Sequence, residues 1–350
     1  MRGTKLTAIA GAIAAGAALA VGSAAVAQQQ DFSKVEIDAV KVTDNMYMLV
    51  GAGGNTTIQF GPEGVLVVDT SFAPMSEKIL AQIKKLSNQP IRYVVDTHVH
   101  GDHIGGNAAI AKAGRTRAGG NVVGDLGNGA TNQAAIIAHE NVLTRLSAPP
   151  PQGQEQVAFD NWPTETFIGN KKEMIFNGEA VQILHEDAAH TDGDSLVMFR
   201  RNDVISTGDL FTTVMYPFID EANGGTINGY INALNAILDL TVASNVNEGG
   251  TMVIPGHGRL SDEQDVIEYR DMVTIVRDRI REYVKRGMTS EQVKAKKPTL
   301  DWDRRYGDGF IKPDAFVEVI YKQMAAEKAA AAPAPATKGK APNKSKGSGE

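Results

Sequence analysis

The sequence contains no cysteine, and this absence excludes several kinds of structure and chemistry. A chain of 350 residues without cysteine has no disulfide bonds, no thiolate ligands for a metal ion and no thiol nucleophile. Any zinc-type site must therefore be built from the side chains of His, Asp and Glu. The folded chain must depend on its apolar core and on any bound metal for its stability.

Runs of basic residues are missing from the body of the chain. The chain carries 35 Lys and Arg residues against 41 Asp and Glu residues, which gives a formal net charge of −6. Proteins that bind nucleic acids usually concentrate positive charge on one face. We therefore expect no nucleic-acid partner, and the sequence leaves the oligomeric state open.

Long apolar runs are also absent beyond the first 27 residues, so we expect no membrane span in the mature chain. The N-terminal segment itself has a positive start at Arg2 and Lys5 and a short apolar run from Leu6 to about Val21. Ala25-Val26-Ala27 then gives a small-x-small cleavage pattern. This order predicts a signal peptide over residues 1–27, cleaved after Ala27, and a periplasmic or secreted protein. An uncleaved membrane anchor is the weaker alternative, because the apolar run is short.

The remaining chain is predicted to form one domain over residues 28–325, followed by a tail. Residues 326–350 consist largely of Ala, Pro, Lys, Gly and Ser and lose all apolar periodicity. Such a composition cannot bury enough apolar surface to fold, so we predict a disordered, basic end.

Apolar patterning within the domain predicts two series of strands, each closed by helices. This order is typical of two packed sheets with helices on both outer faces. Residues 114–133 and 147–162 are predicted to be long loops, and Ser261 with Gln264 has the spacing of a helix-capping box. The predicted strands cover 45–50, 56–60, 64–69, 91–96, 134–138, 173–176, 180–184, 195–199, 203–206 and 251–254, and the predicted helices cover 74–86, 103–112, 141–146, 228–240, 261–286 and 313–328.

Histidine is scarce in this chain, yet three of its seven histidines fall within six residues. His98, His100, Asp102 and His103 follow the predicted strand at 91–96 in the order H-x-H-x-D-H. His98 and His100 are two residues apart and would project from one face of a strand end, while Gly101 allows a turn toward the same point. Imidazoles and a carboxylate that converge in this way are what a zinc-type ion requires.

Three further segments place His or Asp beside glycine near the end of a predicted strand or in the turn next to one. They contribute His190, Asp209 and His257. Each segment alone is most simply a turn, but together with the histidine cluster they indicate one convergent site.

These residues and their order resemble the metal-binding motifs of the metallo-β-lactamase-fold hydrolases, over about residues 35–285. The resemblance implies an α/β, four-layer αββα sandwich with the site at one edge of the two sheets. It also implies a metal-dependent hydrolase that acts on a small molecule.

The resemblance further implies how the seven side chains divide between two zinc ions per chain, with iron or manganese as open alternatives. His98, His100 and His190 would hold one ion, Asp102, His103 and His257 would hold the second, and Asp209 would bridge them. A hydroxide shared by the two ions would be the nucleophile, and Asp102 would orient it and receive a proton. The bond cleaved is expected to be an ester, thioester, lactone, lactam or phosphodiester.

Two features of the motifs bear on the reaction. True β-lactamases of the family generally lack the bridging Asp. The presence of both His103 and Asp209 therefore favours the thioesterase, lactonase, phosphodiesterase and arylsulfatase branches. The predicted export argues in the other direction, because β-lactamases act outside the cytoplasm. A diiron oxidoreductase on the same fold is a further alternative, but that branch usually has Glu where His100 stands. A non-catalytic binding protein would be expected to lack part of the ligand set, and no position is missing here.

Several other polar residues near these motifs are weaker candidates, for which a structural role is at least as well supported. The two remaining histidines and four residues near the ligands fall into this group, namely His139, His185, Asp192, Asp194, Tyr216 and Asn223.

Overall fold

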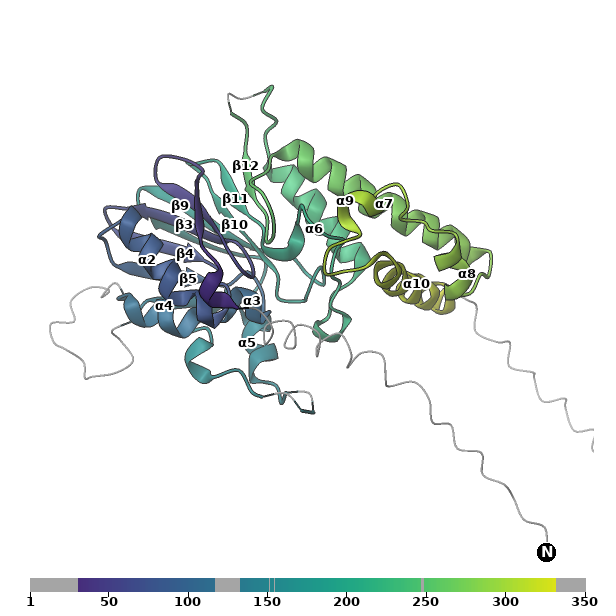
Figure 1. Ribbon diagram of the computed structural model, residues 1–350, viewed down its shortest axis with the longest axis horizontal. Coiled ribbons are helices and arrows are strands. Elements are labelled where there is room, and N and C mark those ends of the chain that lie inside the picture. The colour runs from purple at the N-terminus through teal and green to yellow at the C-terminus, as the bar shows by residue number, and fades with distance from the viewer. Residues whose placement is uncertain (1–30, 117–132, 151, 154, 247–248, 332–350) are drawn as a thin grey trace, which may run out of the picture.

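The chain forms two β-sheets packed face to face between layers of helices (Figure 1). The computed structural model describes residues 31–116, 133–150, 152–153, 155–246 and 249–331. The first sheet has its strands in chain order, with antiparallel pairing from β1 to β4 and parallel pairing from β4 to β7. Its strands are β1 (Asp38–Lys41), β2 (Met46–Val50), β3 (Thr56–Gly61), β4 (Gly64–Val68), β5 (Ile91–Val95), β6 (Ala135–His139) and β7 (Glu165–Phe167).

The second sheet has the order β12-β11-β10-β9-β8. Its central strand β10 runs antiparallel to both neighbours, and β11 runs parallel to β12. Its strands are β8 (Lys171–Phe176), β9 (Glu179–His185), β10 (Ser195–Phe199), β11 (Val204–Ser206) and β12 (Met252–Ile254).

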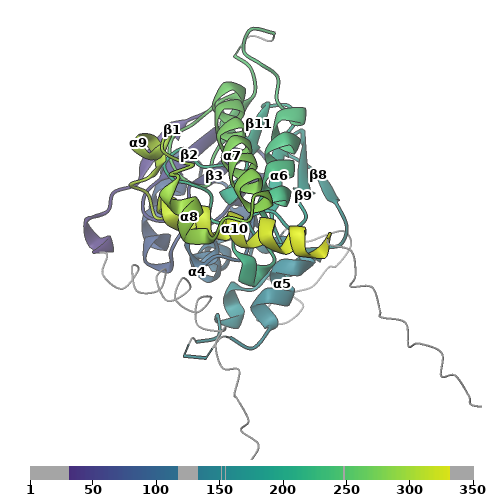
Figure 2. The ribbon, with the colours of Figure 1, turned by 90° about the vertical axis from the view of Figure 1, so that its right-hand side faces the viewer.

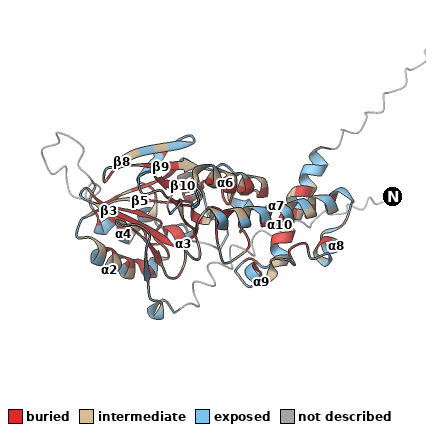
Figure 3. Cartoon of the chain, turned by 90° about the horizontal axis from the view of Figure 1, so that it is seen from above, coloured by how far each residue is buried: buried red, intermediate tan, exposed pale blue. Residues whose placement is uncertain are grey.

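The inner faces of the two sheets form the central core (Figure 3). Leu66, Val68 and Val95 from the first sheet pack with Val197 and Phe199 from the second, and all five are buried. Alternate residues on these strands face outward, and the outward residues of the central strands are also apolar because helices cover them. The apolar runs in the sequence are therefore continuous rather than alternating.

Helices cover the outer face of each sheet, which confirms the predicted αββα sandwich (Figures 1 and 2). On the first sheet lie α2 (Ser76–Leu86) and α4 (Asn107–Ala113). On the second lie α6 (Ile227–Leu240), α7 (Glu263–Lys285) and α10 (Pro313–Ala330), and α10 packs against α7. The remaining short helices are α3 (Gly101–Ile104), α5 (Glu140–Ser147), α8 (Ser290–Ala295) and α9 (Asp303–Tyr306).

The structure differs from the sequence prediction at several element ends. The helix predicted over 103–112 is two helices, α3 and α4, because Gly105 and Gly106 separate them. The predicted capping box is wrong: Ser261 pairs with Val253 in a β-bridge, and Asp262 caps α7 by accepting the backbone N–H of Asp265.

Parts of three other predictions lie outside the described residues. These are the signal peptide, most of the loop at 114–133 and the tail beyond residue 331. At the tail boundary α10 continues to Ala330, so the helix runs five residues past the predicted limit of the domain. Within the described part of the chain, no helix has both the length and the apolar character needed to cross a bilayer.

Candidate metal centre

All seven predicted ligand residues meet at one edge of the sandwich. His98, His100, Asp102 and His103 follow the end of β5, Asp209 follows β11 and His257 follows β12. β11 and β12 are parallel neighbours and end at the same edge of the second sheet, and the antiparallel strand β10 begins there, so His190 in the turn before β10 lies at this edge too. The short distances between ligand atoms show that the end of β5, from the first sheet, lies beside them. The sequence predicted that His98 and His100 project from one face of a strand end; β5 ends at Val95, and both histidines lie in the turn that follows.

The side chains divide into two groups, each with ligand atoms within 4.8 Å of one another. The first group contains His98, His100, His190 and Asp209, and the second contains Asp102, His103 and His257. The family resemblance divided the six other side chains in the same way and gave Asp209 a bridging position between the two groups.

Asp209 faces both groups with its two oxygens. Its Oδ1 lies 3.2 Å from Nε2 of His103 and 3.3 Å from Nε2 of His257, while its Oδ2 lies 3.7 Å from Nε2 of His190. A carboxylate placed in this way can share its charge between two cations.

His98 presents a lone pair to the centre of the first group. Thr97 Oγ1 donates to Asp69 Oδ2 at 2.8 Å, so at 2.9 Å it must accept from Nδ1–H of His98. The opposite nitrogen, Nε2, is then unprotonated, and it is buried without any hydrogen-bond partner.

His100 and His190 are fixed in the same manner by acceptors on the far side of each ring. His100 donates through Nε2 to Asp220 Oδ2 at 2.8 Å, and His190 donates through Nδ1 to the carbonyl oxygen of Phe218 at 2.6 Å. The remaining nitrogens, Nδ1 of His100 and Nε2 of His190, face each other at 2.9 Å.

The donor arrangement fits a bound cation. Two imidazole lone pairs that face each other repel unless a proton or a metal ion lies between them, and a third unpartnered lone pair from His98 points to the same place. Asp209 Oδ1 is also buried without a hydrogen-bond donor. Buried polar atoms without partners are costly, and nitrogen and carboxylate ligands around one point are the ligands that zinc takes.

Carboxylates lie close to both imidazoles of the second group. Nδ1 of His103 donates to Asp69 Oδ2 at 2.7 Å, which directs its Nε2 into the site, 3.4 Å from Nε2 of His257. Asp102 Oδ2 lies 3.4 Å from Nε2 of His257. Two carboxylates, Asp102 and Asp209, thus face two imidazoles.

The pKa values of His190 in the first group and His257 in the second shift in opposite directions. Burial and, second, the neighbouring His100 lower the pKa of His190 to about 4, so this imidazole is neutral and able to act as a ligand. Burial also lowers the pKa of His257, but Asp209 and Asp102 outweigh it and raise the pKa to about 9. Burial opposes ionisation of Asp102, yet His103 and His257 hold its pKa at about 2.

The backbone around the site is shaped for close approach. A Cβ at Gly54 would lie 2.3 Å from the His103 ring, and a Cβ at Gly256 would lie 2.1 Å from Oδ1 of Asp209, so a side chain fits at neither position. Asp69 and Ser71 both have positive φ, at 59° and 58°, a strained conformation that lets the segment after β4 reach the ligands.

Sequence reasoning missed the residues that hold the ligands in place. Asp69 directly follows the strand β4, and the same strand-end signal that identified Asp209 could have identified it. Asp220 follows no strand, and nothing local in the sequence connects it with His100.

The weaker candidates have structural contacts. His139 and His185 stack face to face with ring centroids 3.5 Å apart, outside both ligand groups. Tyr216 is buried with its hydroxyl 2.9 Å from Asp303 Oδ1.

Three polar side chains in this region support turns and do not orient His190. Asp192 binds Arg145, Asp194 accepts the backbone N–H and the hydroxyl of Thr191, and Asn223 donates to Asp220.

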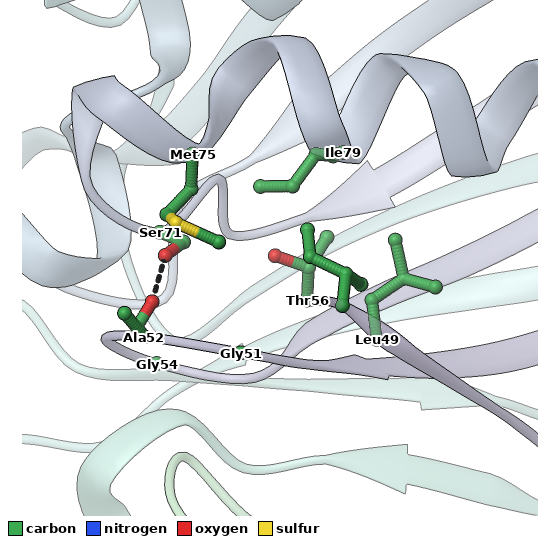
Figure 4. A pocket seen from close by; sticks show the side chains of 9 residues that line it. Leu49, Gly51, Ala52, Gly54, Thr56, Ser71, Met75 and Ile79 are labelled. Atoms are coloured by element: carbon green, nitrogen blue, oxygen red, sulfur yellow. Dashed lines mark hydrogen bonds between the residues drawn. The ribbon is translucent and has the colours of Figure 1, made fainter. Parts of the chain in front are cut away.

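A small cavity lies behind the turn at 51–54 that carries Gly54 (Figure 4). It has a volume of about 10 Å³ and is lined by Leu49, Thr56, Met75 and Ile79 among others, while Ser71 donates a hydrogen bond to the carbonyl of Ala52 at its edge. A space of this size holds at most one water molecule, so it is a packing gap and not a substrate site.

A comparison with models of protein families identifies the family of the chain. The model of the metallo-beta-lactamase superfamily matches residues 50–257, which contain all seven ligand residues. The chain belongs to the metallo-beta-lactamase superfamily.

Several proteins with similar sequences are named as hydrolases. The chain is 23% identical over 257 residues to a linear primary-alkylsulfatase from a Pseudomonas species, which covers 66% of this chain and 47% of the relative. It is 21% identical to a type 2 metallo-beta-lactamase from a Bacillus species, over 60% of this chain and 69% of the relative. A segment of 82 residues, 23% of this chain and 13% of the relative, is 33% identical to an alkyl/aryl-sulfatase of Saccharomyces cerevisiae. The prediction of a metal-dependent hydrolase family is thus confirmed.

A solved superfamily structure has the same fold over most of the chain. The inverting sec-alkylsulfatase Pisa1 from a Pseudomonas species superposes with a TM-score of 0.61 at 16% identity, over 85% of this chain and 52% of that one. The chain therefore spans about half the length of both alkylsulfatases.

We predict that Asp220 positions His100 for metal binding. Replacing Asp220→Ala removes the acceptor that fixes the His100 ring, and loss of such a partner typically weakens metal binding about 10- to 100-fold. Competition with a zinc chelator, followed by metal analysis, measures this change. Glu221→Gln is the matched control, since Glu221 contacts Gln323 and not a ligand. An unaltered chelator midpoint for Asp220→Ala would show that the hydrogen bond is not needed.

Proposed function

We propose that the chain is an exported hydrolase with two zinc ions, which cleaves an ester-type bond in a small molecule. The observation that carries this proposal is the pair of ligand groups joined by the two oxygens of Asp209. Two metal ions held by a shared carboxylate are a recurring arrangement in enzymes that hydrolyse esters and phosphodiesters.

The donor set favours zinc over the alternatives. Five of the seven side chains are imidazoles, and none is a thiolate. Imidazole suits zinc and iron, whereas manganese prefers sites dominated by oxygen ligands. Because His100 occupies the position where the diiron branch usually has Glu, zinc is the metal we propose, and an oxidoreductase with two iron ions is the alternative.

Bound zinc would lower the pKa of a water molecule toward 7 and polarise the bond to be cleaved. The protein groups then have separate tasks. Asp102 has a side chain that is 26% exposed and a pKa of about 2, so it is an ionised acceptor at the solvent-facing side of the cluster. From there it can orient the attacking water and take up its proton.

The other residues keep the site rigid. The acceptors Thr97, Asp220 and Phe218 each fix one imidazole, so the ligands need little rearrangement during the reaction. His98, His103 and His190 are fully or almost fully buried, whereas His100 and His257 reach solvent with side chains that are 19% and 17% exposed. The substrate would approach from this exposed side.

A sulfate ester of an alkyl or aryl alcohol is the substrate class that we propose first. Two of the named relatives are alkylsulfatases or alkyl/aryl-sulfatases, and both His103 and Asp209 are present, as expected for that branch. A β-lactam is the second candidate, because a type 2 metallo-beta-lactamase is also among the relatives. Thioesters, lactones and phosphodiesters complete the set of bonds to be assayed.

Export is part of the proposal and rests on the N-terminal pattern of residues 1–27. When the full gene product is made in a Gram-negative host, the periplasmic fraction is expected to contain a chain that begins at Gln28. N-terminal sequencing and intact mass check the cleavage site. Ala25→Arg with Ala27→Arg blocks the small-residue pattern, and processing that continues unchanged in this variant would argue against a signal peptide.

Zinc-dependent hydrolysis should depend on the first ligand group. Wild-type protein is expected to bind two zinc ions per chain and to cleave a medium-chain alkyl sulfate, while His100→Ala loses metal and more than about 100-fold in activity, since it removes a ligand and not merely its partner. His185→Ala removes an imidazole outside the cluster and serves as the control. Metal analysis and a panel of sulfate-ester, β-lactam, lactone, thioester and phosphodiester probes give the readout. Two iron ions with no hydrolysis of any probe would overturn the proposal.

Asp102→Asn separates proton handling from metal binding. Asparagine keeps the shape and one oxygen ligand but cannot take up a proton, so kcat at saturating zinc is expected to fall about 100-fold or more. Asp44→Asn changes a surface carboxylate on the turn between β1 and β2 and provides the control. If Asp102→Asn retains kcat within twofold of wild type while zinc content stays at two per chain, Asp102 has no role in proton transfer.

A further inference from the structure

The segment after Asp209, residues 211–220, is fastened to the C-terminal helices, which lie beyond the part of the chain that the family model matches. The hydroxyl of Tyr269 on α7 donates to the carbonyl of Met215 at 3.0 Å. The hydroxyl of Tyr216 lies 3.1 Å from the carbonyl of Thr299. Gly309 packs so closely that a Cβ there would lie 2.4 Å from Cβ of Met215.

One apolar side chain of this segment contacts two ligand residues, and a second lies beside the residue that follows a third. The Phe218 ring stacks on His100, with centroids 5.5 Å apart and planes 21° apart, and it meets the His190 ring edge to face with centroids 5.6 Å apart. Val214 lies beside the backbone of Gly258, the residue that follows His257. Phe218 thus lies beside the first ligand group, and Val214 lies near the second.

The C-terminal part of the chain adds a third apolar side chain. Phe310, between α9 and α10, packs edge to face on Phe218 with ring centroids 6.1 Å apart. The neighbouring Gly309 lies against the backbone of Val214. Val214, Phe218 and Phe310 therefore form an apolar surface, which we call the C-terminal wall.

Two of the three side chains of the C-terminal wall are partly exposed to solvent. Val214 is 48% exposed and Phe310 is 46% exposed, while Tyr216, Tyr269 and Phe316 behind them are fully buried. Apolar surface that stays exposed beside a reactive centre, on a rigid support, is typical of ligand-binding sites.

We infer that the C-terminal wall binds the apolar group of the substrate while the metal centre holds the bond that is cleaved. The inference rests on the proposed function and specifies its substrate: an alkyl or aryl chain attached to the polar ester. Burying one methylene contributes about 0.8 kcal/mol, which corresponds to about fourfold in affinity. Selectivity should therefore increase with the length of the chain.

Binding of n-alkanesulfonates with four to ten carbons tests the inference without requiring turnover. In calorimetric titrations of the zinc-loaded full chain, below micelle-forming concentrations, affinity is expected to rise by up to about fourfold per methylene. Phe310→Ala and Val214→Ser should flatten this dependence, with the largest loss for the longest probe. Phe310→Leu keeps an apolar side chain and should preserve it.

A matched control is Phe159→Ala, which removes another exposed aromatic ring, 76% exposed and packed on Trp162. The dependence on chain length should survive this change. If Phe159→Ala flattens it instead, or if Phe310→Ala weakens all probes equally at unchanged zinc content and thermal stability, the assignment to the C-terminal wall is overturned.

The same titrations separate this inference from the proposed function. Affinity that rises with chain length in wild type and is lost in Phe310→Ala, without cleavage of any alkyl sulfate, would refute the sulfatase proposal but keep the C-terminal wall as an apolar binding surface. Affinity that does not depend on chain length in wild type would refute the wall, whatever bond the enzyme cleaves.

Discussion

The rest of this structure depends on one constraint: two imidazole nitrogens, Nδ1 of His100 and Nε2 of His190, are held 2.9 Å apart, and either a proton or a metal ion must lie between them. His100 and His190 point their free nitrogens at each other because Asp220 and the carbonyl of Phe218 take the protons on the opposite sides of the rings. Without a proton or a metal ion between them, the two lone pairs would repel each other. The strained backbone at Asp69 and the tight glycine contacts hold groups together that would otherwise separate.

This constraint explains why the ligand set could be predicted from sequence and its supports could not. Ligands must reach one point from several strands, so they occur at strand ends with glycine, a pattern that a single sequence displays. A supporting residue only needs to reach the far side of one ring. Asp69 happens to share the strand-end position, but Asp220 acts from a turn more than a hundred residues from His100, and only the folded chain brings the two together.

The same contrast holds for the fold. Strands in the centre of each sheet have apolar runs because both faces are covered, and the sequence predicted them with small errors at their ends. The edge strands β1 and β7 were missed because most of their residues are exposed and carry no apolar pattern. The short helices α8 and α9 were missed for a related reason, since each buries a single residue.

The chain divides its tasks between two regions. Every ligand lies within residues 50–257, the part matched by the superfamily model, whereas the helices beyond it supply no ligand. Those helices cover the second sheet, and through Tyr269 and the backbone at Gly309 they also fix the segment that carries Val214 and Phe218. A common metal site can serve many reactions, so selectivity must come from what surrounds it. In this protein the same tyrosine-anchored contacts that stabilise the C-terminal helices also determine which apolar surface stands beside the metal centre.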